Sequence, residues 1–256
     1  MKEYLEFAEE IARYAGKIML KYFNVNNKDS YKGDKTIVTL ADSKINSYLI
    51  ERVKERYPNH CVDGEEEVFG KSNYVWVCDP IDGTSMYARH VPVAVFSLAL
   101  VIDGKSMVGV IYDPFLDNMY TAISGRGAYC NNKIIRVNNY KLDDIRTMCH
   151  CDMCSHSDFD VLKFLSVASN SISFNDIGSI ARASMCVASG YYSLAIFTGN
   201  KHKNCDVAAV KVIVEEAGGK VTDLYGSDQR YDGDIRGAII SNGTVHNDII
   251  EIINNL

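Results

Sequence analysis

The sequence predicts a layered α+β protein with a well-filled core. Residues 3–23 and 41–57 carry apolar side chains at the three- and four-residue spacings that are typical of amphipathic helices. Between residues 94 and 123, apolar runs alternate with turn residues at a spacing that predicts an antiparallel meander. Hydrophobic residues make up 47% of the 256 residues, which is ample for a packed core.

The N-terminal elements follow from local patterns. The polar, glycine-containing segment 24–38 comes after the first helix and predicts a loop or loose hairpin of the kind that can act as a lid. Pro58 ends the second helix, and residues 62–67 predict a turn. Residues 86–91 are expected to form a short helix or a loop.

The remaining elements alternate between strands and helices. A hairpin turn is expected at Asn131-Asn132, and residues 145–156 are expected to begin as a strand and end as a loop. The other strands are expected at residues 94–102, 107–112, 118–123, 191–197 and 238–241, with helices at 158–168, 180–188, from Asp206 to about 216, and toward Leu256.

Charge and composition limit the function. A net charge of −6 and a pI near 5.5 argue against nucleic acid or an acidic membrane as the partner. A phosphorylated small molecule stays compatible, because bound cations reverse the local sign of charge. No apolar run approaches the ~20 residues that span a bilayer, the N-terminus shows no signal-peptide core, and the eight cysteines are scattered. We therefore expect a cytoplasmic protein.

The stretch 76–85 carries the chemistry. It begins as an apolar, β-forming run and ends in Asp79 and Asp82, so it predicts a buried strand that stops at a turn. Two carboxylates this close in a partly buried site repel each other, and a hard divalent cation would relieve that repulsion. Gly83, Thr84 and Ser85 would open a helical turn whose free N–H groups cradle an anion such as phosphate. This combination predicts phosphoryl chemistry.

Three other acidic positions have both an ordinary and a functional interpretation. Asp42 and Asp206 each stand in the first turn of a predicted helix, where a carboxylate is favourable without any further role. The run 65–67 consists of three glutamates, which is typical of a solvated surface. Only a short loop separates that run from the strand before Asp79, so one glutamate is positioned to reach the same cation.

Read together, these motifs resemble the inositol monophosphatase family of magnesium-dependent, lithium-sensitive phosphatases, within the fructose-1,6-bisphosphatase-like fold. The resemblance covers nearly the whole chain, and its most specific part is Asp-Pro-Ile-Asp-Gly-Thr at 79–84. It implies a five-layer α/β/α/β/α sandwich formed by residues 1–256 as a single unit, with approximate halves 1–145 and 146–256. It also implies a homodimer.

The resemblance implies a role for each matched residue. Glu65, Asp79 and the Ile81 carbonyl would hold a first Mg²⁺, and Asp79, Asp82 and Asp206 a second, with two or three ions per site. All-oxygen ligation suits Mg²⁺ better than zinc. Thr84 and Asp42 match the pair that orients the attacking water together with Glu65. The backbone N–H groups of Gly83 and Thr84 would hold the phosphate.

The implied reaction is hydrolysis of a small phosphomonoester, such as an inositol, sugar or polyol phosphate. A metal-activated water attacks in line, the second metal stabilises the leaving alkoxide, and no side-chain nucleophile is required. The segment 31–38 corresponds to a mobile segment that closes over the site, where Lys35 is positioned to meet phosphate charge.

Substrate choice is open, because the chain departs from the family pattern. Cys205 stands where a tryptophan commonly precedes the metal-binding aspartate, and residues 195–197 offer no acidic side chain to bind inositol hydroxyls. We expect substrate contacts from Ser85, Lys201 and His202, in loops near Lys35, His90 and Lys201. The basic cluster 201–203 would suit a second phosphate, as in fructose 1,6-bisphosphate, or is simply a solvated loop. Histidinol phosphate stays open, and adenosine 3′,5′-bisphosphate ranks lower because Ser85 replaces a lysine common in that branch.

Two readings from other classes stay open. Residues 149–156 contain three cysteines and two histidines, which are zinc ligands. They lack the two separated ligand pairs of a zinc knuckle, and Cys151 with Cys154 makes a similarly weak redox pair. The other reading is a catalytically silent binding protein on the same fold.

Overall fold

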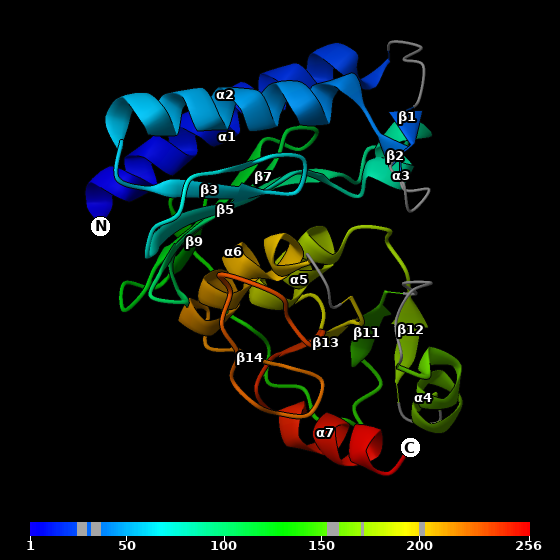
Figure 1. Ribbon diagram of the computed structural model, residues 1–256. Helices are drawn as coiled ribbons and strands as arrows, with labels where there is room; N and C mark the ends of the chain where they lie inside the picture. Colours follow the sequence, from blue (N-terminus) through cyan, green and yellow to red (C-terminus); the bar gives the residue numbers. More distant parts are fainter. Residues whose placement is uncertain (25–29, 32–36, 153–158, 170–171, 200–202) are drawn as a thin grey trace.

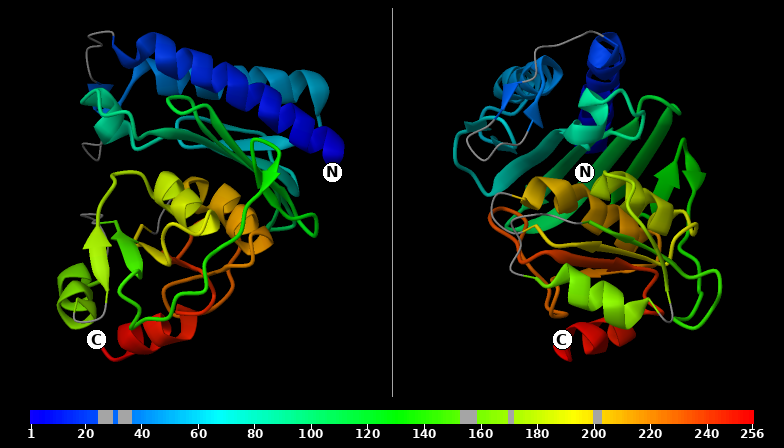
Figure 2. Two further views of the ribbon diagram at one scale, coloured as in Figure 1. Left: turned by 180° about the vertical axis from the view of Figure 1, so that it is seen from behind. Right: turned by 90° about the vertical axis from the view of Figure 1, so that its right-hand side faces the viewer.

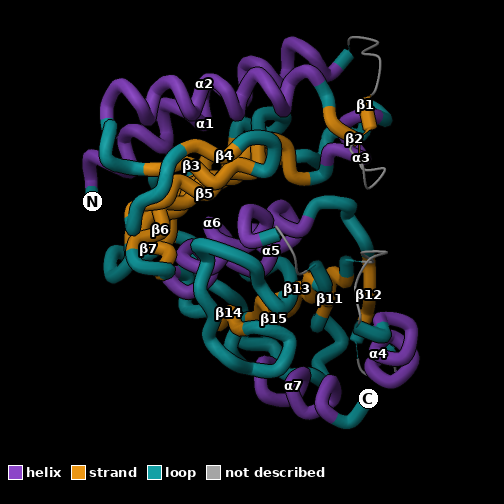
Figure 3. The backbone as a smooth tube through the Cα atoms, in the orientation of Figure 1, coloured by secondary structure: helices purple, strands orange, loops and turns teal. Residues whose placement is uncertain are grey.

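The computed structural model describes residues 1–24, 30–31, 37–152, 159–169, 172–199 and 203–256. Its elements stack in five layers: two sheets, a helical layer between them, and a helical layer on the outer face of each sheet (Figure 1). The same alternation of helical and strand layers is visible in the backbone tube (Figure 3). The five-layer α/β/α/β/α sandwich expected from the sequence is confirmed.

The first layer consists of α1 (Lys2–Phe23) and α2 (Leu40–Arg56). They cover one face of an eight-stranded sheet, and Figure 2 shows α5 and α6 on its other face. The sheet order is β10-β9-β8-β7-β6-β5-β3-β4, with bounds β3 Cys61–Gly64, β4 Val68–Phe69, β5 Tyr74–Asp82, β6 Val95–Ile102, β7 Lys105–Asp113, β8 Asn118–Ile123, β9 Ala128–Cys130 and β10 Lys133–Ile134.

The apolar stripe of α1 explains the packing of this layer. Phe7, Ile11 and Met19 recur along one helix face and are fully buried, as the periodic pattern requires. Trp76 of β5 is also fully buried and lies against Phe7, with ring centroids 5.0 Å apart. Burial of large aromatic side chains at this interface anchors β5, the strand that carries Asp79 and Asp82.

The middle layer consists of α5 (Ile180–Ala188) and α6 (Asn204–Glu216), which lie between the two sheets. Because α6 is covered on both sides, its residues 204–210 are all buried. The helix approaches β7 closely at Gly109, where a Cβ would lie 2.6 Å from Val212 Cγ1 and 2.8 Å from the Ala209 carbonyl oxygen. The absence of a side chain at Gly109 therefore sets the distance between α6 and the sheet.

The second sheet has five strands in the order β12-β11-β13-β15-β14. β11 pairs in parallel with β12 and β13, whereas β15 is antiparallel to both its neighbours. Two helices, α4 (Val161–Ala168) and α7 (His246–Asn254), cover its outer face. The strand bounds are β11 Met148–Cys151, β12 Ser173–Asn175, β13 Leu194–Phe197, β14 Lys220–Thr222 and β15 Ala238–Ser241.

Most predicted elements are confirmed, with differences at their ends. The predicted strands 118–123 and 238–241 and the helix 180–188 match β8, β15 and α5 residue for residue. The hairpin at Asn131-Asn132 is confirmed, and both asparagines have positive φ, as a tight two-residue turn requires. The segment 24–38 contains a short antiparallel pair, β1 (Ser30–Tyr31) and β2 (Ile37–Val38).

Three expectations are wrong in part. Residues 62–64 are not a turn, because they belong to β3, which is buried beside β5 in parallel pairing. The helix expected from residue 158 begins at Val161, since the Asp160 side chain accepts a hydrogen bond from the Lys163 N–H at 2.9 Å. The strand expected from residue 191 begins at Leu194, since Tyr191 is 73% exposed. The division into halves near residue 145 stays a prediction.

Membrane-spanning segments were also sought. Among the helices of the described ranges, none combines the length and the apolar character needed to cross a bilayer.

His246 at the start of α7 makes stability depend on pH. Its ring is buried, with Ser241 Oγ 2.8 Å from Nδ1 and Thr222 Oγ1 3.0 Å from Nε2. Burial, followed by the charges of Lys220 and Lys211, lowers the pKa of His246 from 6.5 to about 4. The folded protein therefore binds fewer protons than the unfolded chain in this window, so this contribution is full above pH 6.5 and is lost as pH falls toward 4.

We expect the free energy of unfolding to fall by about 2–3 kcal/mol from this group between pH 6.5 and pH 4. Urea unfolding of the parent and of His246→Gln across that range measures the difference in slope. Identical slopes for His246→Gln and the parent would contradict the assignment.

Candidate functional site

Three buried carboxylates meet where β5 ends and α6 begins. Asp79, Asp82 and Asp206 each place one carboxylate oxygen within 4.8 Å of the others. Their exposed fractions are only 2%, 6% and 4%. The first two come from one strand and the third from more than a hundred residues later, so the fold itself assembles the cluster.

The end of β5 is shaped by backbone geometry. The Ile81 N–H donates to Asp79 Oδ1 at 2.9 Å, and the pairing with β6 shifts register between Asp79 and Asp82. Gly83 then turns the chain with φ +90°, and a Cβ there would lie 2.9 Å from the Gly178 carbonyl oxygen. The positive φ and this close approach together require glycine. The bulge lets both aspartates face the same point.

Hydrogen bonds from α5 hold Asp82 in place. Asp82 Oδ2 accepts from the Ser179 hydroxyl and, at 2.9 Å, from the Ala181 N–H. Ser179 also caps α5, because its oxygen accepts from the Arg182 N–H at 3.1 Å. One serine therefore fixes both the start of a middle-layer helix and the orientation of a site carboxylate.

The N-terminal end of α6 contributes a carboxylate and a cation. Lys203 Nζ lies 3.0 Å from Glu65 Oε1 and 3.7 Å from Asp206 Oδ2. Asn204 fixes this helix end, since its side-chain amide donates to Asp63 Oδ2 at 2.8 Å and to the Tyr231 carbonyl at 3.0 Å. Contacts from β3 and α6 thus bring Glu65 to the carboxylate cluster.

The cluster is electrostatically costly without a cation. Burial, followed by the charges of Glu65, Asp206 and Asp82, raises the pKa of Asp79 well above its usual value. Burial and Asp206 raise the pKa of Asp82 to about 7, and burial also raises the pKa of Asp206. Converging carboxylate oxygens are the ligands that hard divalent cations prefer. The arrangement therefore fits a metal of that class.

One carboxylate oxygen of Asp42 caps a helix, which is the ordinary role, and the other oxygen is available for a second role. Thr39 N–H and Oγ1 donate to Asp42 Oδ2 at 2.8 and 2.6 Å, which completes a capping box at the start of α2. Asp42 Oδ1 is buried and has no hydrogen-bond partner within the described residues. Burial raises the pKa of Asp42 to about 7, and the charges of Glu66 and Glu65 add to the rise.

Thr84 begins α3 (Thr84–Ala88), directly after the Gly83 turn. Its Oγ1 donates to the Ile81 carbonyl at 2.8 Å, so the hydroxyl is fixed beside the strand end that carries the two aspartates. The amides in the first turn of a helix lack partners within that helix. The expected anion cradle at residues 83 and 84 is therefore compatible with the backbone.

The sequence interpretation missed Ser179 and Asp152, and it considered Lys203 only as part of the basic cluster 201–203. Ser179 and Lys203 contact cluster carboxylates directly, and Asp152 at the end of β11 interacts with Asp206 electrically. Burial and the charge of Asp206 raise the pKa of Asp152 to about 6. The start of α5 after Gly178 was the available signal for Ser179, because serine is a favoured N-cap.

The expected substrate residues fare differently. Ser85 is exposed, and both its Oγ and its carbonyl accept from Arg89 Nη1, at 2.9 and 2.6 Å. The His90 ring contacts the Phe23 carbonyl near the end of α1. Lys35, Lys201 and His202 lie outside the described residues. Cys205 is buried, with its Sγ 4.0 Å from Asp206 Oδ1, so the departure from tryptophan lies directly beside the cluster.

The cysteine and histidine run does not converge in its described part, residues 149–152. Successive strand residues point to opposite faces, so His150 of β11 is directed away from Cys149 and Cys151. His150 Nδ1 accepts from the Ile177 N–H at 3.2 Å, and both cysteines belong to the apolar core under α4 and α7. Residues 153–156 lie outside the described residues, so the zinc alternative rests on positions that the structure leaves open.

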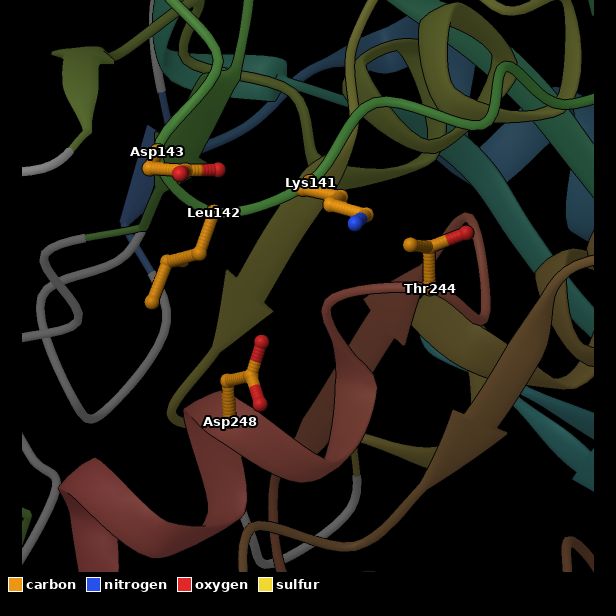
Figure 4. A pocket seen from close by; sticks show the side chains of 5 residues that line it. All are labelled: Lys141, Leu142, Asp143, Thr244 and Asp248. Atoms are coloured by element: carbon orange, nitrogen blue, oxygen red, sulfur yellow. The ribbon is translucent and has the colours of Figure 1, made fainter.

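A separate pocket lies beside α7, on the outer side of the second sheet (Figure 4). Figure 4 shows Lys141 directed toward Thr244 and the Asp248 carboxylate directed into the pocket. Leu142 and Asp143 complete its lining. None of the residues that the sequence analysis selected lines this pocket, so the carboxylate cluster is the candidate site.

Comparison with known proteins identifies the family and the fold of this chain. The sequence model of the inositol monophosphatase family matches residues 1–256. The fructose-1,6-bisphosphatase/inositol-1-monophosphatase of Thermotoga maritima is 29% identical over 252 residues, covering 98% of this chain and 95% of that protein. Inositol monophosphatase 3 of Solanum lycopersicum is 31% identical over 244 residues, covering 89% and 88%. The solved structure of a Thermotoga maritima IMPase superposes with a TM-score of 0.87 at 28% identity, covering 99% and 97%.

Ser179→Ala should lower the free energy of unfolding by about 1–2 kcal/mol, because it removes a helix cap and a hydrogen bond to a buried carboxylate. Ser179→Thr should restore most of the loss, since threonine also caps and donates. Urea unfolding measures both variants. Ser184→Ala on the same helix is the control, because the Ser184 hydroxyl donates its hydrogen bond within the helix, to the Ile180 carbonyl. Equal stability of Ser179→Ala and Ser184→Ala would contradict this role.

Proposed function

From the premise that this chain belongs to the inositol monophosphatase family and hydrolyses phosphomonoesters, we propose that it acts with Mg²⁺ on a small sugar or polyol phosphate. The observation that carries the proposal is the approach of Asp79, Asp82 and Asp206 to within 4.8 Å of one another in a buried setting. A metal-dependent phosphatase requires such a cluster, whereas a silent binding protein does not.

The donor set fits the ion. All the groups assigned to it are oxygens: Glu65, Asp79 and the Ile81 carbonyl for one Mg²⁺, and Asp79, Asp82 and Asp206 for another. Burial and the neighbouring carboxylates keep the pKa values of Asp79 and Asp82 raised despite the nearby Lys203, so added positive charge would favour their ionised form, and divalent cations supply it. When bound, Mg²⁺ would lower the pKa of a water and polarise the phosphoryl oxygens. Two or three ions per site stay the expectation from the family.

The chain's own residues would orient the attacking water. Thr84 Oγ1 already lies against the Ile81 carbonyl, and Asp42 Oδ1 is buried with an unused lone pair. Glu65 follows the end of β3 and lies in the same region, since its charge adds to the rise in the pKa of Asp42 that burial mainly causes. We assign Glu65, Thr84 and Asp42 to orient that water, and a carboxylate of Glu65 or Asp42 to take up its proton, since a general base must lie within hydrogen-bond reach.

The phosphate would bind where the chain turns after β5. Gly83 and Thr84 present backbone N–H groups at this point, close to both site aspartates, and backbone amides bind phosphate oxygens. A Cβ at residue 83 would contact the Gly178 carbonyl, so the cradle depends on glycine. The water would attack the phosphorus in line with the bond to the alcohol oxygen, and the alcohol would leave without a covalent enzyme intermediate.

The substrate's alcohol half is the least constrained part. Relatives carry the names of inositol monophosphatases, and one also carries that of fructose-1,6-bisphosphatase. We propose Ser85, Lys201 and His202 as substrate contacts. A second phosphate group on the substrate is the alternative that the relative's name supports. The homodimer, the lithium sensitivity and the cytoplasmic location stay predictions.

A phosphate-release panel with MgCl₂ tests the function. It comprises inositol 1-phosphate, fructose 1,6-bisphosphate, other sugar and polyol phosphates, histidinol phosphate and adenosine 3′,5′-bisphosphate, each with and without lithium. We expect release from a sugar or polyol phosphate that stops on chelation and is inhibited by lithium. If the protein hydrolyses no member of the panel, the proposal is contradicted and a binding protein is favoured.

Asp82→Asn should abolish phosphate release while the fold persists, because asparagine still accepts the bonds from Ser179 and Ala181 but loses the charge. The expected loss in kcat/KM is about a thousandfold, the scale of several kcal/mol of transition-state stabilisation by a metal. Circular dichroism and a phosphate-release assay check the two parts.

The matched control for this substitution is Asp103→Asn. Asp103 is exposed in the β6–β7 turn and has positive φ, which asparagine accepts. Its turnover should equal the parent's. Near-parental turnover in Asp82→Asn would overturn the assignment of Asp82.

A further inference from the structure

We propose that Lys203 is a built-in counter-cation of the carboxylate cluster, which stabilises the metal-free protein and weakens the binding of the divalent ion at Glu65. The inference rests on the proposed function, since it concerns the same cluster. It assigns to this chain's own lysine a role in setting metal affinity.

The position of the ammonium group carries the argument. Lys203 Nζ lies 3.0 Å from Glu65 Oε1 and 3.7 Å from Asp206 Oδ2. In the proposed assignment, Glu65 binds one metal ion and Asp206 binds the other. The lysine therefore bridges ligands of both ions, from the residue directly before α6.

Without a divalent ion, this ammonium offsets buried negative charge. The charge of Lys203 acts on Asp79 and Asp206 in the direction that lowers their pKa values, against the effect of burial. A buried carboxylate deprived of its cationic partner is strongly destabilising, because the charge is left in a low-dielectric setting. Loss of the lysine charge should therefore cost stability in the metal-free protein.

With a divalent ion, the same ammonium becomes a competitor. An ion bound to Glu65 would lie within a few ångströms of a like charge, and such repulsion is large compared with thermal energy in a partly buried site. Part of the metal's binding free energy must therefore go to moving the ammonium away from Glu65 or to tolerating the repulsion. The Lys203 side chain is 33% exposed, so it has an outlet to solvent for that movement.

A role limited to binding the substrate's phosphate is the competing explanation. It predicts that loss of the lysine raises KM but leaves metal binding and the stability of the metal-free protein unchanged. The two explanations are therefore separated by measurements made without substrate.

The test compares Lys203→Met, which keeps the length of the side chain, with Lys203→Arg, which keeps the charge. On chelator-treated protein, thermal unfolding should show a midpoint about 4 °C lower for Lys203→Met. Isothermal titration with MgCl₂ should show about tenfold tighter binding in that variant. Lys203→Arg should stay within about twofold of the parent in metal affinity.

Lys211→Met is the matched control on the same helix. Lys211 also pairs with two carboxylates, at 2.9 Å from Glu215 Oε1 and 2.8 Å from Asp228 Oδ1, but these are remote from the cluster. Its removal should leave the Mg²⁺ affinity within about twofold of the parent's. A change in affinity equal to that of Lys203→Met would show a general charge effect and overturn the inference.

A double variant locates the effect. In a Glu65→Gln background, Lys203→Met should lower the metal-free midpoint by less than it does in the parent, because the nearer of the two carboxylate partners of Lys203 is neutral. The inference would be overturned if Lys203→Met bound Mg²⁺ no more tightly than the parent, or if its metal-free midpoint were unchanged. In that case the proposed function would still stand as long as the parent protein releases phosphate. Absence of Mg²⁺ binding in the parent itself would instead defeat the proposed function.

Discussion

The structure depends on the concentration of buried negative charge at one point. Asp79 and Asp82 at the end of β5 meet Asp206 at the start of α6, with Glu65 joined to them through Lys203. Burial of these carboxylates and then the repulsion between them raise the pKa values of Asp79 and Asp82, and both effects oppose folding with the groups charged. The protein holds them together by hydrogen bonds from α5, by the lysine, and, in the proposed function, by divalent ions. In the proposed function, the same electrostatic cost that opposes folding gives the site its affinity for metal.

The five layers make this concentration possible. The outer helices bury β5 through contacts such as that of Phe7 with Trp76, and this packing fixes the position of the strand. The middle helices approach the sheet closely at Gly109, and they bring Ser179 and Asp206 to the strand end from the other part of the chain. Each carboxylate of the cluster thus lies on an element that apolar packing fixes, which is how a packed core positions a polar site.

Much of this was predictable from the sequence. Helical and alternating patterns identified α1 and β8, because each buries one apolar face. α5 and β15 are buried almost throughout, and they were identified as a helical pattern and an apolar run that each end at turn residues. The motif at residues 79–84 predicted a buried strand that ends in two aspartates, and the structure has both features. The metal-binding role of these aspartates stays a prediction. The roles of Ser179 and Lys203 were not predictable, because they arise from contacts between segments 97 and 138 residues apart. Residues 62–64 were misassigned because pairing with β5 outweighs their turn-forming composition.

The central claim is that the buried cluster binds divalent metal ions, and anomalous diffraction from crystals of the protein soaked in MnCl₂ tests it most directly. Mn²⁺ prefers the same oxygen ligands as Mg²⁺ and gives a signal that identifies its position. We expect one anomalous peak between Glu65 and Asp79. We expect another among Asp79, Asp82 and Asp206. A map without peaks at these carboxylates, or with its peaks at the cysteine and histidine run instead, would contradict the account.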